Sequence, residues 1–135
     1  MRIDFYIGSR YNKHIGSRYN ERRYKEEQTL SSQALTEAVY YILLSLLEPM
    51  HGYGIMQNVE KLSHGRVSLA AGTLYGAINT LLEKRWITAL PGEKSSRKKE
   101  YQITDRGRKA LCAEIDRLTE LLENGKQMLS LEEKG

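Results

Sequence analysis

The sequence predicts a mainly α-helical fold with a small β-hairpin wing, and two features carry this prediction. Apolar residues recur at the spacing of one buried helical face, at Leu74, Ile78, Leu81 and Leu82. A basic run from Lys94 to Lys99 follows, between two short β-like segments. A helix that allows close approach, followed by a basic hairpin, is the layout of a winged helix-turn-helix, in which one helix enters the DNA major groove.

The positive charge is concentrated in two parts of the chain. The 135 residues carry a net charge of +4, and this length predicts one domain with a tail. Residues 1–28 hold 7 basic and 4 acidic side chains, and residues 63–104 hold 7 basic and 3 acidic ones. This segregation favours a polyanionic partner, with a merely solubilising surface as the alternative.

Residues 1–28 are predicted to form a flexible tail rich in arginine and tyrosine. The tail contains an octapeptide repeat, in which Ile-Gly-Ser-Arg-Tyr-Asn occurs at 7–12 and again at 15–20. Its apolar surface is too small to offset the entropy of ordering. We interpret the tail either as an arm that lies along phosphates or in a minor groove, or as a duplication without a function.

Residues 29–104 are predicted to form the winged helix-turn-helix domain, with helices over 32–48, 53–62 and 71–84. Ser31 or Ser32 caps the first helix and Pro49 ends it. Its buried stripe is Leu35, Val39, Ile42, Leu43 and Leu46. A turn at 50–52 leads to the second helix, which stops before Gly65. The inward residues of this second helix are Ile55, Met56, Val59 and Leu62.

Two short strands, 86–90 and 99–103, are predicted to frame the wing. Pro91-Gly92 opens it, and Tyr101 and Ile103 share one face of the returning strand. Its basic residues are Arg97, Lys98 and Lys99. We expect these three side chains to contact phosphate or the minor groove, and a purely solvated hairpin is the alternative.

The outer side of the third helix carries small or hydrogen-bonding residues instead of the usual Lys and Glu. Gly72 and Gly76 either pack within the fold or allow the backbone to approach DNA closely. Asn79 has the amide that pairs bidentately with adenine, and a plain exposed asparagine is the alternative. Thr73 and Thr80 are expected to contact phosphate or a thymine methyl group.

Two tyrosines complete the candidate DNA-binding residues. Tyr75 lies at the edge of the buried helical face, where its ring packs and its hydroxyl reaches a phosphate, or where it is purely structural. Tyr53 opens the second helix, and this helix crosses the DNA backbone in helix-turn-helix proteins. A phosphate contact is therefore expected for Tyr53 as well.

Residues 105–135 are predicted to form a C-terminal dimerisation helix that begins at Thr104-Asp105. Apolar residues follow at alternating steps of four and three, as in a heptad seam, at Leu111, Ile115, Leu118, Leu122 and Leu129. Gly125 falls in this seam, where glycine costs about 1 kcal/mol relative to alanine. No other helix of the chain needs such a partner, so we assign the seam to a homodimer.

The composition argues against several other classes of protein. The single Cys112 forms no intrachain disulfide, and no apolar run is long enough for a membrane span. The start is too polar for a signal peptide, so we expect a cytoplasmic protein without a membrane partner. His14, His51 and His64 form no metal-ligand pattern. Phosphate-loop and nucleophile motifs are also missing, so we expect no enzyme and no cofactor.

Three motifs give the chain a family resemblance. They are His51-Gly52-Tyr53-Gly54-Ile55, the run from Gly72 to Ile78, and the run from Lys99 to Gly107. In this order and spacing they resemble the PadR family of bacterial transcriptional regulators, in its short branch with a single C-terminal helix. The resemblance implies a homodimer that binds a double-stranded DNA operator and represses transcription, and a small-molecule effector that weakens DNA binding.

The chain departs from the family pattern at three places. Ala70-Ala71 stand where members commonly have Ser-Pro, and alanine is a poor helix cap. Trp86 replaces a usual glycine, and the last helix lacks the aromatic residues that hold flat drugs in some members. The weak cap, together with Glu83 on the outer face, keeps a second hypothesis open: a winged-helix protein-interaction module without specific DNA binding.

Overall fold

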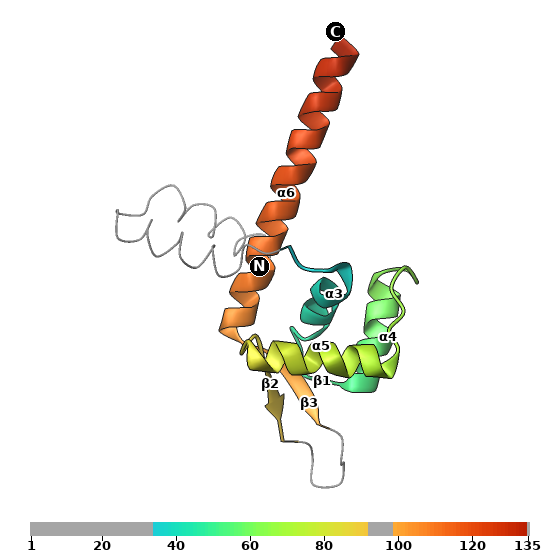
Figure 1. The fold of residues 1–135 in the computed structure, drawn as a ribbon, viewed down its shortest axis with the longest axis vertical. Helices are drawn as coiled ribbons and strands as arrows, with labels where there is room; N and C mark the ends of the chain where they lie inside the picture. Colours follow the sequence, from blue (N-terminus) through green and yellow to red (C-terminus); the bar gives the residue numbers. More distant parts are fainter. Residues whose placement is uncertain (1–33, 92–98, 135) are drawn as a thin grey trace, which may run out of the picture. The chain divides into compact units, whose positions relative to one another are not determined.

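The computed structural model describes residues 34–91 and 99–134. The chain divides into two compact units, one of residues 35–111 and one that contains residues 112–134. The described elements are, in order, α3 (Glu37–Ser45), β1 (Met50–His51), α4 (Gly52–Leu62), α5 (Ala71–Glu83), β2 (Ile87–Leu90), β3 (Glu100–Ile103) and α6 (Asp105–Lys134) (Figure 1). This is the predicted mainly helical fold with a small antiparallel sheet and a C-terminal helix.

Helix α3 is shorter at both ends than the sequence predicted. It begins after Thr36, because the Thr36 side chain accepts a hydrogen bond from the N–H of Val39 over 3.2 Å. The prediction of a start near residue 32 was therefore wrong, and the predicted caps Ser31 and Ser32 lie outside the described residues. At the other end the N–H of Leu46 reaches two carbonyls, which tightens the last turn before Pro49.

Helix α4 follows β1 directly and buries a narrow line of residues. Gly52, Ile55 and Val59 are buried, whereas Met56 is half-buried. Leu62 was predicted to face inward and is instead 41% exposed, because it lies in the last turn, where the chain leaves the core. The next residue, Ser63, is buried, and its hydroxyl accepts from the N–H of Val67 over 3.0 Å. This bond shapes the connection toward α5.

The sheet has three antiparallel strands in the order β1-β3-β2. Strand β3 pairs with β2 on one side and with the two residues of β1 on the other, Met50 opposite Tyr101. The sequence predicted only a turn at residues 50–52, which was wrong, because the second edge of β3 takes up two extended residues there. Tyr101 and Ile103, which were predicted to share one face of this strand, are both buried, so that face points into the core.

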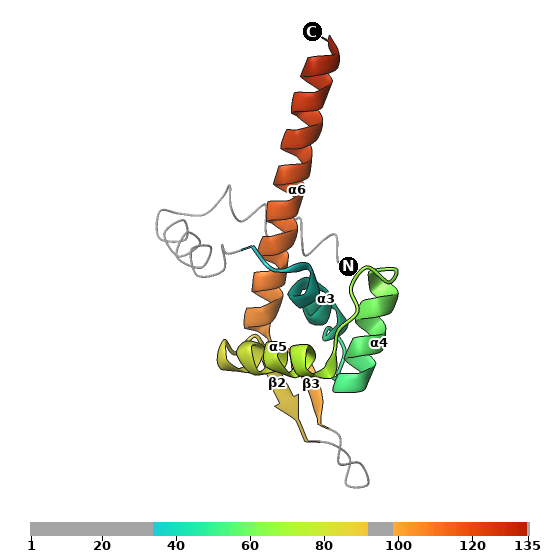
Figure 2. The same ribbon diagram turned by 45° about the vertical axis from the view of Figure 1, so that its right-hand side comes forward.

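The core of the first unit lies between α3, α4, α5 and the sheet (Figure 2). Its least exposed apolar side chains, at 0–2%, are Ile42, Leu43, Leu46, Ile55, Val59, Leu74, Ile78, Leu81 and Ile87. Each contributes on the order of 1.5–3 kcal/mol by leaving water. Three of them, Leu74, Ile78 and Leu81, come from α5, so burial fixes which side of α5 remains exposed.

A compact set of hydrogen bonds made by Thr104 joins the end of α5, the residue before β2 and the start of α6. The Thr104 hydroxyl donates to the Arg85 carbonyl over 2.7 Å, and the Thr104 N–H donates to the Trp86 carbonyl over 2.9 Å. The Thr104 oxygen also accepts from the N–H of Gly107 over 3.1 Å. Thr104 therefore caps α6, which begins at Asp105 as predicted.

Gly107 is essential to this junction because a side chain has no room there. An added Cβ would lie 2.1 Å from the Trp86 carbonyl oxygen. We predict that Gly107→Ala lowers the free energy of unfolding by about 3 kcal/mol, the upper part of the range for overpacking. Urea unfolding followed by circular dichroism measures this loss, with the exposed neighbour Arg108→Ala as the control. Equal stability of the two variants would contradict the prediction.

Candidate nucleic-acid interface

Six of the predicted DNA-binding residues lie on one exposed side of α5. The predicted inward residues Leu74, Ile78 and Leu81 are buried, and Leu82 is half-buried. The exposed residues are Gly72, Thr73, Tyr75, Gly76, Asn79 and Thr80. The structure therefore brings together a helical surface whose side chains are small or carry hydrogen-bonding groups, as the sequence predicted.

Gly72 and Gly76 have no packing role among the residues that the structure describes. A Cβ added to either one would have no heavy atom within 4 Å in this part of the chain. Glycine in a helix interior costs about 1 kcal/mol relative to alanine. Packing was one of the two interpretations of these glycines, and the described surroundings do not support it. The other interpretation, close approach of the backbone to DNA, stays a prediction.

The N-terminus of α5 lacks a side-chain cap. Ala70 occupies the cap position and makes no side-chain hydrogen bond, and the first turn carries no acidic residue. The first N–H groups of a helix have no partner within the helix and attract anions. This end of α5 is therefore electrostatically suited to a phosphate group, although Ala70 itself offers no hydroxyl.

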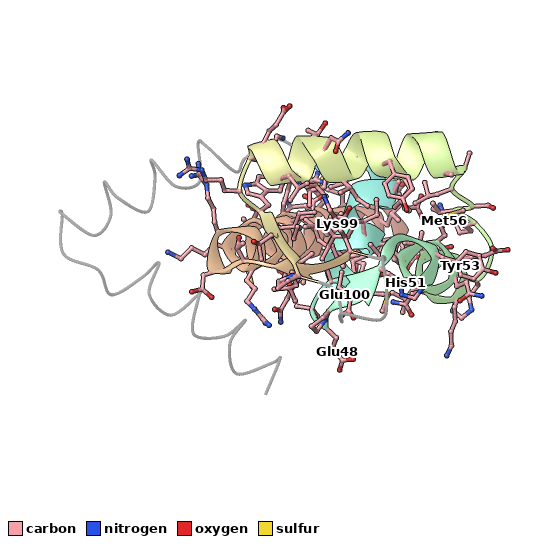
Figure 3. The ribbon with its side chains drawn as sticks, turned by 90° about the horizontal axis from the view of Figure 1, so that it is seen from below. Glu48, His51, Tyr53, Met56, Lys99 and Glu100 are labelled. Atoms are coloured by element: carbon pink, nitrogen blue, oxygen red, sulfur yellow. The ribbon has the colours of Figure 1, made fainter. Side chains whose placement is uncertain are left out.

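Tyr75 lies against the first residue of α4. A Cβ added to Gly52 would be 2.5 Å from the Tyr75 Oη atom, so the ring occupies the space that a side chain at Gly52 would need. Tyr75 is 46% exposed, and the neighbouring Tyr53 is 61% exposed. Figure 3 labels Tyr53 and Met56 on α4. Sequence reasoning missed the role of Gly52, although its place in the first motif was visible.

The wing is described only at its base. Arg97 and Lys98 lie outside the described residues, whereas Lys99 is exposed directly before β3. Figure 3 shows Lys99 in the same view as Glu100 and His51, which are partners in the pairing of β1 with β3. Lys99 is therefore the one residue of the three predicted basic wing residues that the structure describes, and it is accessible to a partner.

Within residues 34–91 and 99–134, no group of three or more His, Cys, Asp and Glu side chains is placed to hold a metal ion. None of the described helices is both long enough and apolar enough to cross a membrane.

The order of helices, the three-stranded sheet and the exposed side of α5 define a winged-helix protein. Residues 42–113 match the model of the transcriptional regulator PadR-like family, and this match spans more than half of the 135 residues. The chain therefore belongs to the PadR-like family of transcriptional regulators. This confirms the resemblance carried by the three sequence motifs.

Solved structures share the fold. The transcriptional regulator TA0346 from Thermoplasma acidophilum is 25% identical, with a TM-score of 0.54 over 77% of this chain and 95% of that one. A PadR family regulator from Eggerthella lenta is 23% identical, with a TM-score of 0.55 over 82% and 94%. Bacillus subtilis PadR in complex with operator DNA is 23% identical, with a TM-score of 0.50 over 58% and 46%. A comparison with curated proteins gives no match.

The contact between Gly52 and Tyr75 predicts a measurable coupling. We expect Gly52→Ala to lower the free energy of unfolding by about 1 kcal/mol, because the new methyl group displaces the Tyr75 ring. In a Tyr75→Ala background the same change becomes neutral or stabilising, because alanine is the better helix former. A double-mutant cycle by urea unfolding measures the difference. The same cost in both backgrounds would show that the ring is not the obstacle.

Proposed function

We propose that this chain is a sequence-specific, double-stranded DNA-binding regulator that acts as a repressor. The observation that carries the proposal is the exposed side of α5, where Gly72 and Gly76 leave the backbone open. Family membership and the operator complex of Bacillus subtilis PadR support it. In this proposal α5 enters the major groove, and its exposed side meets the base edges.

We assign the recognition of the DNA base sequence to residues in the middle of α5. The exposed Asn79 amide offers a donor and an acceptor in the arrangement that adenine requires. The Thr80 hydroxyl donates to the Gly76 carbonyl over 3.1 Å, so its oxygen remains as an acceptor and its methyl group as an apolar contact. For the exposed Thr73 we propose a contact with a phosphate or a thymine methyl group.

Phosphate contacts are assigned to residues around α5. Tyr53 at the start of α4 and Tyr75 on α5 are 61% and 46% exposed, and the exposed Lys99 brings a positive charge directly before β3. Arg97 and Lys98 are included on the basis of their charge. Such contacts position a protein on the duplex and make its affinity depend on salt, without reading the sequence.

We further propose that the regulator works as a homodimer through α6 and that a small-molecule effector weakens DNA binding. Exposure varies along the predicted seam. Leu111 is 4% exposed and Ile115 is half-buried, whereas Leu118, Leu122 and Leu129 are 41–62% exposed. We therefore place most of the contact with the second copy in the C-terminal half of α6. The effector is proposed from the family resemblance alone.

Fluorescence-anisotropy titration at two salt concentrations tests the proposed function. One duplex carries the DNA upstream of the protein's own gene, and the other carries the same bases in scrambled order. A preference of about 1000-fold or more for the upstream duplex is expected of a specific regulator. Equal and strongly salt-dependent binding to both duplexes would contradict sequence-specific recognition. Absence of binding at low salt would favour the protein-interaction module instead.

Gly76→Ala is predicted to change stability and DNA binding in opposite directions. The free energy of unfolding should rise by about 1 kcal/mol, because alanine favours the helix and its methyl group meets no described atom. DNA affinity should fall at least about tenfold, because the same methyl group separates α5 from the duplex. Urea unfolding and anisotropy measure the two effects. Unchanged affinity in the more stable variant would argue against close approach of α5.

Asn79→Ala and Lys99→Ala are predicted to weaken DNA binding in different ways. Loss of the Asn79 amide should cost about 1–3 kcal/mol and relax the preference at one base position. Loss of the Lys99 charge should weaken binding to all duplexes similarly and make the dependence on salt shallower. Titration of each variant against single-base variants of the bound duplex separates the two. An equal loss on every sequence for Asn79→Ala would exclude base reading by this residue.

A further inference from the structure

From Leu118 onward, α6 exposes a run of large apolar side chains. The exposed fractions lie between 41% and 67% for Leu118, Leu121, Leu122, Met128, Leu129 and Leu131. Charged residues are interspersed with these apolar ones along the sequence, so this part of α6 is amphipathic and not uniformly hydrophobic. An apolar surface of this kind on a helix of a PadR-like regulator is typical of an interface between proteins.

Four of these positions are arranged symmetrically around Gly125. Three and four residues before Gly125 stand Leu122 and Leu121, and three and four residues after it stand Met128 and Leu129. On a helix with 3.6 residues per turn, Leu118 and Gly125 lie on the centre line of the apolar face. Leu121 and Met128 lie on one side of this line, and Leu122 and Leu129 lie on the other. The pattern reads nearly the same in both chain directions.

Gly125 sits in the middle of α6 without interrupting it. No described heavy atom lies within 4 Å of the position that its Cβ would occupy. A larger residue would favour the helix and would extend the apolar face. A glycine at the centre of an apolar helical face instead allows the backbone of a second helix to come close, as small residues do at helix crossings.

We propose that the α6 helices of two copies of this chain cross antiparallel at Gly125, with the two-fold axis of the dimer passing beside it. The proposal rests on the dimer of the proposed function and specifies its geometry. A symmetric dimer uses the same surface on both copies. In the antiparallel arrangement, Leu122 meets the partner's Leu129 and Leu121 meets the partner's Met128. The apolar residues on each side of the centre line therefore pack against the same residues of the second copy.

Charge favours the antiparallel direction over the parallel one. The centre line continues from Gly125 to Glu132, so a parallel pair would place the two Glu132 carboxylates opposite each other, which is unfavourable. In the antiparallel pair Glu132 lies level with the partner's Leu118, next to the partner's Arg117. The Arg117 guanidinium is fixed by Glu114, with Nε–Oε1 and Nη2–Oε2 distances of 2.5 Å and 3.0 Å. The partner's Glu132 therefore faces an ion pair in this arrangement, and not a second unpaired carboxylate.

Disulfide trapping in the full chain tests the crossing point. Both variants are made in a Cys112→Ser background, which removes the native thiol. Gly125→Cys is expected to form a covalent dimer under mild oxidation, because the two positions meet at the axis. Glu132→Cys is expected to remain uncrosslinked, because the two positions are about 21 Å apart along antiparallel helices. Non-reducing gel electrophoresis reads both results, and crosslinking of Glu132→Cys would overturn the antiparallel direction.

A second measurement covers the case in which the thiol at 125 itself separates the helices. Leu122→Cys protein is mixed with an equal amount of a size-tagged Leu129→Cys protein, and the mixed disulfide is expected to exceed each self-crosslink.

Gly125→Leu should raise the dimer dissociation constant at least about tenfold in sedimentation equilibrium, with Asn124→Ala as the unaffected control. A dimer that binds DNA but fails both crosslinks would overturn the crossing and leave the proposed function standing. A monomeric wild-type chain that binds no DNA would overturn both.

Discussion

The position of β2 and β3 relative to α5 depends on the hydrogen bonds made by Thr104. One residue binds the Arg85 and Trp86 carbonyls and caps α6 through Gly107. It thereby ties the end of α5 and the start of β2 to the end of β3. Arg85 adopts a φ of 61°, a left-handed backbone conformation that costs a non-glycine residue about 1 kcal/mol or more. The bonds to Thr104 hold this turn, and Trp86 next to it is buried with the Lys84 ammonium 4.7 Å from its ring centroid.

The other end of α5 is positioned by α4 in two ways. Ser63, at the end of α4, binds both the N–H and the carbonyl of Val67 and so fixes the direction of the loop. The ring of Tyr75 rests on Gly52 at the start of α4. Together with the buried residues of α5, these contacts leave little freedom for the exposed side to turn. A surface that reads DNA needs this rigidity, because base contacts act over hydrogen-bond distances.

The sequence predicted the elements that bury a regular face and failed where tertiary contacts decide. The bounds of α5 followed from its own spacing of Leu74 and Ile78, and the start of α6 followed from Thr104 and Asp105. By contrast, β1 has only two residues and exists because β3 offers them a free edge. The true cap of α3, Thr36, has the same chemistry as Ser31 and Ser32, so local sequence alone does not choose between them. The side chain over Gly52 comes from α5 and is invisible to any local pattern.

The described helical glycines fall into two groups, those that the packing of the fold requires and those that it does not. At Gly52 and Gly107 a Cβ would collide with Tyr75 and with the Trp86 carbonyl, so the fold itself requires glycine there. At Gly72, Gly76 and Gly125 a Cβ would meet no described atom, and each lies within a helix. A helix gains stability when such a glycine is replaced, which gives the fold no reason to retain it. In the function and the helix crossing that we propose, contacts with other molecules supply the reason: DNA at α5 and a second copy of the chain at α6.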